Sequence, residues 1–177
     1  MQAAKIKQTE VMCIRVDHTL AEELRNEAEY VNISLNVLVN HIFRRYVEWD
    51  RDAGKLGFIP VTKELFASLM EKLDDAQVEQ IAKDAVKNIS DIVIYMQKRF
   101  DLQGVLQWLD ELCKVSGFAK KHVMNNSLHT FIVQHDLGLK CSMYFKMVFE
   151  MIFGKLQKKI EPDVTSQSIA FTVDVED

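Results

Sequence analysis

The stretch from Val11 to Tyr46 constrains the fold more than any other part of the sequence. It begins with "VMCIRVD", whose alternating apolar residues predict a short strand, and continues into two segments with helical spacing. A lone strand leaves its backbone N–H and C=O groups unpaired, so it needs a neighbouring strand. Since no second strand is predicted nearby, we expect the strand to pair with the same strand of a second copy.

Three apolar faces run through this stretch. Alternation places one face on the strand, and the two predicted helices each carry an apolar stripe, with Ser34 as the N-cap of the second. Some 40 residues with three such faces cannot enclose a core alone. We therefore expect a homodimer whose core includes Met12, Ile14, Val16, Leu38 and Ile42.

The segments "MCIRVD", "LAEELRNEAEYV", "NIS" and "SLNVLVNHIFRRYVEW" together resemble the ribbon-helix-helix family of dimeric DNA-binding regulators. The resemblance implies that the outer face of the ribbon enters the major groove of operator DNA. It implies that Val11, Cys13 and Arg15 face the bases. Phosphate contacts are expected at Lys5, Lys7 and the backbone N–H groups near Ser34, Leu35 and Asn36.

The charge of this region leaves a second interpretation open. Residues 1–53 carry seven Lys/Arg against nine Asp/Glu, a net charge of −2, and the whole chain has a net charge of −4. Phosphate neutralisation supplies much of DNA affinity. The alternative is an interaction or scaffold protein that uses the same module only to dimerise.

Composition and spacing divide the 177 residues into three parts. Residues 1–53 form the predicted ribbon-helix-helix module, residues 54–100 a helical connecting segment, and residues 101–177 an α+β domain in the order αββαβ. We expect this third region to sense a signal or to extend the dimer to a higher homo-oligomer. We expect helix caps at Thr62, at Asp74 or Asp75, and at Asp101, with Gln77 placed for a capping box from Asp74. We also expect a new helix after Ser90 and a hairpin turn at Asn125–Asn126. The predicted fold class is mostly α, with a small antiparallel sheet and helices at the C-terminus.

The predicted helix from Leu139 onward is apolar on nearly every side, so more than one neighbour must cover it. We expect it to fill the core or a dimer interface. A methionine-rich row also suits adaptable binding surfaces, so a ligand or partner surface is the alternative. The residues concerned are Met143, Met147, Met151 and Phe149.

Imidazole and thiol groups near the predicted hairpin raise the question of a metal site. His129, His135 and Cys141 are the candidates, since such ligands suit Ni²⁺, Cu²⁺ or Zn²⁺. The order of regions is similar to that of nickel-responsive ribbon-helix-helix repressors, although their His-x-His pair is absent here. His129 and His135 would stand roughly 20 Å apart along a strand. We therefore predict no metal or cofactor, with a metal- or ligand-responsive regulator as an alternative.

Several function classes lack their sequence signatures. The chain has no Gly-rich phosphate loop, no GxSxG elbow and no HExxH motif, so we do not expect an enzyme. No stretch predicts a membrane span or a signal peptide, and the three cysteines lie far apart. The sequence thus predicts a cytoplasmic homodimeric transcription regulator of the repressor type that binds double-stranded DNA.

Overall fold

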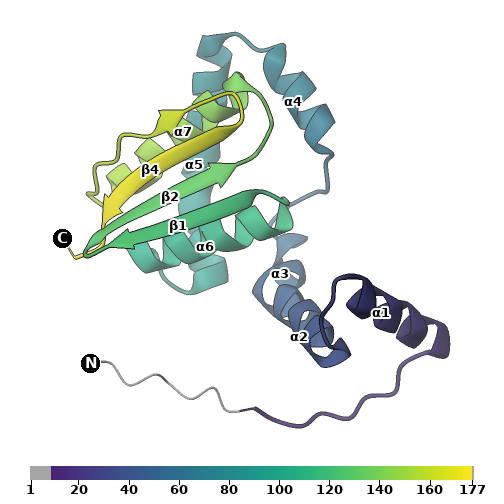
Figure 1. Ribbon diagram of the computed structural model, residues 1–177. Helices are drawn as coiled ribbons and strands as arrows, with labels where there is room; N and C mark the ends of the chain where they lie inside the picture. Colours follow the sequence, from purple (N-terminus) through teal and green to yellow (C-terminus); the bar gives the residue numbers. More distant parts are fainter. Residues whose placement is uncertain (1–8, 177) are drawn as a thin grey trace. The chain divides into compact units, whose positions relative to one another are not determined.

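The computed structural model describes residues 9–176 and divides into two compact units, residues 1–47 and residues 48–177 (Figure 1). The first unit contains α1 (His18–Tyr30) and α2 (Leu35–Arg45). The Asp17 side chain caps α1 by accepting a hydrogen bond from the N–H of Thr19. Ser34 is the N-cap of α2, as predicted, and its hydroxyl accepts from the N–H of Val37 at 3.2 Å.

The predicted strand at residues 11–16 is wrong, and with it the resemblance to ribbon-helix-helix proteins. In the described chain the first regular element is α1, and the four strands all belong to one C-terminal sheet. Alternating apolar residues make a strand only where a neighbouring backbone completes the hydrogen-bond ladder. Among the described residues, β1 pairs with β2, β2 with β4, and β3 with β4, so residues 11–16 have no strand partner. Met12, Ile14 and Val16 are instead 72%, 54% and 41% exposed.

The second unit contains the remaining elements. A π-helical turn (Tyr46–Asp50), which spans the boundary between the units, and α3 (Arg51–Ala53) precede three longer helices, α4 (Lys63–Glu71), α5 (Asp75–Gln97) and α6 (Leu102–Val115). The α+β part then follows, with β1 (Ala119–Asn125), β2 (Leu128–Gln134), α7 (Leu139–Lys155), β3 (Asp163–Val164) and β4 (Ser168–Asp174). The predicted class, mostly α with an α+β C-terminal part, is confirmed.

Local sequence signals explain where these helices begin. Thr62 caps α4, Asp101 caps α6, and Asp74 and Gln77 form a reciprocal capping box at the start of α5. The break expected at Ser90 is absent, since α5 runs without interruption to Gln97. Its buried stripe continues through Ile89 and Val93, so packing carries the helix past the cap-like serine.

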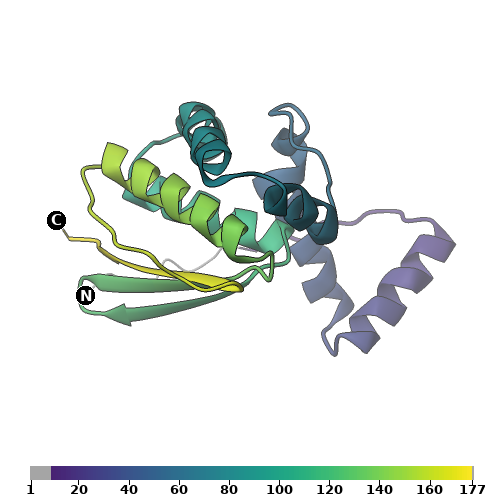
Figure 2. The same ribbon diagram turned by 90° about the horizontal axis from the view of Figure 1, so that it is seen from above.

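The sheet has the strand order β1-β2-β4-β3, and all its pairs are antiparallel. Helices α5, α6 and α7 lie on one side of it (Figure 2). Helix α6 lies against β1, α7 lies against β3 and β4, and α5 packs on both of these helices. The core between sheet and helices includes Phe131, Phe153, Ile169, Phe171 and Val173.

Helix α7 is covered on two sides, by the sheet and by α5, which accounts for its uniformly apolar sequence. Phe149, Ile152 and Phe153 are buried, and Met147 and Met151 pack against the core. Met143 is 37% exposed. Within residues 9–176, none of the helices has the length and apolar character needed to cross a bilayer.

Candidate functional site

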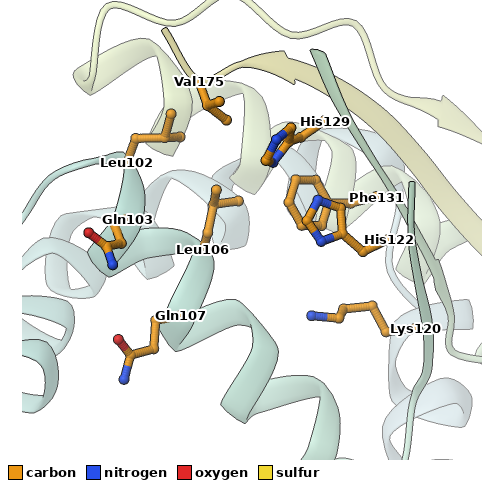
Figure 3. A pocket seen from close by; sticks show the side chains of 9 residues that line it. All are labelled: Leu102, Gln103, Leu106, Gln107, Lys120, His122, His129, Phe131 and Val175. Carbon is orange, nitrogen blue, oxygen red and sulfur yellow. The ribbon is translucent and has the colours of Figure 1, made fainter. Parts of the chain in front are cut away.

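A cavity of about 420 Å³ lies between α6 and the β1–β2 hairpin (Figure 3). One wall comes from α6, the other from the helix-facing side of the hairpin, and a residue that follows β4 closes one end. The lining residues are Leu102, Gln103, Leu106, Gln107, Lys120, His122, His129, Phe131 and Val175.

The α6 wall is built from residues four apart, which fall on consecutive turns of one helix face. Leu102 and Leu106 form an apolar row, and Gln103 and Gln107 a polar row beside it. Gln103 Oε1 accepts a hydrogen bond from Arg99 Nη1 at 2.9 Å, which leaves the Gln103 NH₂ as a donor. Gln107 Nε2 donates to Glu111 Oε1 at 3.1 Å, which leaves the Gln107 carbonyl as an acceptor.

The strand register builds the opposite wall. His122 pairs with Phe131 across the hairpin, and alternate residues of both strands point to the same face. The His122 imidazole stacks on Phe131, with ring centroids 4.2 Å apart and an angle of 12° between the ring planes. The His129 ring lies 4.9 Å from that of His122, and Lys120 extends beside them (Figure 3).

The ionisable groups that line the cavity are all bases. Lys120 is paired with Asp110 of α6, and Lys114 shares the same carboxylate. Although burial opposes ionisation of Asp110, hydrogen bonds from both lysines hold its pKa below the usual range. The pKa of His122 is also lowered, mainly by burial and further by His129 and Lys120. His122 is therefore mostly neutral at pH 7.

The three residues considered for a metal site have different surroundings. His129 lines the cavity, whereas His135 is fully buried, with both ring nitrogens engaged. Its Nδ1 accepts from the N–H of Leu137 at 3.0 Å, and its Nε2 lies 2.9 Å from Ser142 Oγ. Cys141 is buried, which raises the pKa of its thiol to about 11. Across residues 9–176, no cluster of three or more His, Cys, Asp or Glu side chains has metal-binding geometry.

The residues predicted to contact DNA lie in the first unit or before it. Val11, Cys13 and Arg15 are exposed in the segment that precedes α1, and no strand orients them toward one face. Ser34, Leu35 and Asn36 mark the start of α2, where the Asn36 carbonyl and side chain both accept from Asn40. Lys5 and Lys7 lie outside the described residues.

Most of the cavity was not predicted from the sequence. Gln103, Gln107, Lys120, His122 and Phe131 belong to no recognisable sequence motif. The signal that unites them is the hairpin register together with the four-residue spacing on α6. No protein-family model and no curated protein matches this chain.

Proposed function

We propose that this protein is a homodimeric regulatory protein whose copies are joined through the N-terminal helical unit, residues 1–47. One observation carries the proposal. Among residues 9–47, Ala28 is the single buried side chain. The unit therefore has helices and caps, but its described residues form no core of their own.

The surface that lacks a cover is apolar and continuous along α2. Leu35, Ile42 and Tyr46 are 36%, 43% and 56% exposed and follow one another at helical intervals. Leu20 on α1 is 49% exposed, and Phe43 widens the α2 stripe. A unit of this size seldom stays folded alone, so covering this surface stabilises it.

The uncharged character of this apolar stripe on α2 favours a second copy of the protein as the partner that covers it. The residues along it are uncharged, so two copies can pack it against itself around a two-fold axis without opposing any charge. The acidic residues Glu22, Glu23 and Glu27 are exposed on α1, where they keep the rim of such an interface solvated. The three cysteines are unpaired, which fits a reducing compartment, and we propose the cytoplasm.

Light scattering coupled to size-exclusion chromatography tests the dimer. We expect a mass twice the 20.5 kDa of one chain, and a monomer for Ile42→Lys, because the change places a charge in the shared interface. Ile59→Lys is the matched control, since Ile59 is 77% exposed in the other unit, and it should remain dimeric. A monomeric parent protein, or a dimeric Ile42→Lys variant with an unchanged circular dichroism spectrum, would overturn the proposal.

DNA is the second candidate partner, and Arg15 is the observation that favours it. Within residues 9–176 its guanidinium is exposed and makes no recorded hydrogen bond or ion pair, so it is available to a phosphate or a base edge. Fluorescence anisotropy with random-sequence duplex DNA at 50 and 200 mM salt is the test. Binding that weakens with salt and with Arg15→Ala would support a transcription regulator, and no binding at low salt would leave dimerisation alone.

A further inference from the structure

We propose that the cavity between α6 and the β1–β2 hairpin is a binding site for a small flat organic acid, one that carries a carboxylate or sulfonate on an aromatic or similarly planar body. The site lies wholly within residues 48–177 and is independent of the dimer proposed above.

The size and walls of the cavity fit such a molecule. Its volume of about 420 Å³ lies within the range of small-molecule sites, which are mainly apolar with a few placed polar groups. Leu102 and Leu106 on α6 face Phe131 and the stacked His122 ring across the cavity (Figure 3). A flat body can lie between the leucine row and these rings.

The polar groups select the charge of the ligand. Lys120, His122 and His129 project from the hairpin into the cavity, and no acidic side chain is among the described residues that line it. Lys120 shares the Asp110 carboxylate with Lys114, so this one carboxylate does not offset the charge of both ammonium groups. A carboxylate near Lys120 would meet this charge and the N–H donors of the histidines.

The same groups disfavour a metal cation. Two neighbouring histidines offer nitrogen ligands, but a third ligand is absent from the described residues, and Lys120 would repel a divalent ion. On the α6 wall, the NH₂ of Gln103 adds a donor and the carbonyl of Gln107 an acceptor. A carboxylic acid with a hydroxyl or amine substituent can use both.

Fluorescence titration with 8-anilinonaphthalene-1-sulfonate, an anion with a planar naphthalene body, is the first measurement. N-phenyl-1-naphthylamine has the same ring system without the sulfonate and serves as the uncharged comparison. We expect saturable binding of the sulfonate at micromolar concentration and at least tenfold weaker binding of the uncharged analogue. Equal binding of both probes would overturn the proposed anion selectivity.

Two lysines on the same strand provide the matched variants. Lys120 faces the cavity, and Lys121 points to the other side of the sheet and is exposed. Lys120→Gln should weaken sulfonate binding at least fivefold, Lys121→Gln should leave it within twofold, and Lys120→Arg should restore most of it. Equal effects of the two glutamine variants would place the anion elsewhere and overturn the proposal.

Proton NMR of the imidazole resonances locates the probe and guards against binding to the apolar N-terminal unit. The sulfonate should shift the resonances of His122 and His129 and leave those of the buried His135 unchanged. If Zn²⁺ or Ni²⁺ shifts the His122 and His129 resonances and the sulfonate does not, the site binds metal and the proposal is wrong. Circular dichroism of Lys120→Gln excludes unfolding as the cause of lost binding.

Discussion

The imidazole Nε2 of His135 lies 2.9 Å from the hydroxyl oxygen of Ser142, and this contact ties the end of β2 to the first turn of α7. The Ser142 hydroxyl donates in turn to the carbonyl oxygen of Thr165 at 2.5 Å. Because Nδ1 accepts from the N–H of Leu137, the proton of the neutral ring resides on Nε2. A chain of hydrogen bonds thus joins three segments at one end of the sheet.

Stability should fall as the solution is acidified through the ordinary range of histidine. Burial lowers the pKa of His135 in the folded protein, so below about pH 6.5 the unfolded chain binds a proton that the folded protein excludes. Urea denaturation at pH 7.5 and pH 5.5 measures the effect. The loss between the two pH values should be smaller in His135→Gln, and an equal loss in both proteins would contradict this role of His135.

Ser142→Ala should destabilise the fold by about 1–3 kcal/mol, because the buried His135 ring and the Thr165 carbonyl lose their hydrogen-bond partner. The exposed Ser166 offers a matched control, for which the same change to alanine should stay within about 0.5 kcal/mol. Thermal or urea denaturation gives both values. Equal stability of the two variants would show that the hydrogen-bond chain contributes nothing net.

Replacement of two glycines on or beside α7 by alanine should change the stability of the fold in opposite directions. Gly138 has φ +89°, a backbone conformation that an L side chain rarely adopts, so Gly138→Ala should cost about 1–3 kcal/mol even if the flexible Glu71 carboxylate moves away from the new Cβ. Gly154 lies within the helix with open space around it, so Gly154→Ala should stabilise by about 0.5–1 kcal/mol. Denaturation midpoints of the two variants distinguish these signs.

Thiol labelling should reveal one reactive cysteine in the native protein. Cys13 is exposed, whereas burial raises the pKa of Cys113 and of Cys141 to about 11, which keeps both thiols protonated and covered. An aromatic disulfide reagent at pH 8 should titrate one thiol rapidly in native protein and three in guanidinium. Rapid labelling of Cys113 would contradict the packing of α6.

The pKa of His122 should rise when its cationic neighbour is removed. Burial, His129 and Lys120 all lower this pKa in the parent protein. Lys120→Gln removes one of these causes, so the NMR titration midpoint of His122 should move upward, whereas Lys121→Gln should leave it in place. An unchanged midpoint in Lys120→Gln would mean that Lys120 does not approach the ring.

Structural features that depend only on residues close in the sequence could be predicted. Ser34, Thr62, Asp74 and Asp101 cap helices as their local patterns indicated, because a cap needs only the next three residues. Structural features that depend on contacts between residues far apart in the sequence could not be predicted. The strand expected at residues 11–16 needed a ladder partner, and the uninterrupted helix at Ser90 depends on burial against other elements.

An error of one residue in the predicted hairpin turn was enough to prevent prediction of the cavity wall. A turn at Asn125–Asn126 would place His122 directly opposite His129, but the structure puts the two loop residues at Asn126 and Ser127. This shift of one residue moves each strand partner by two, so His122 faces Phe131. The parity of the faces is unchanged, yet the stacked pair that forms the wall appears only with the correct register.

Both walls of the cavity come from one continuous stretch, residues 102–131, and Val175 alone is supplied from elsewhere among the described residues. The apolar lining residues also belong to the core or pack against it: Phe131 is a core residue, and Leu102, Leu106 and Val175 contact the core. The polar lining residues, Gln103, Gln107, Lys120, His122 and His129, are not part of that core. Substitution of these polar residues can therefore alter what the cavity accepts while the apolar lining and the core stay intact. Ligand preference can thus change during evolution at five polar positions without loss of the packing that holds the fold.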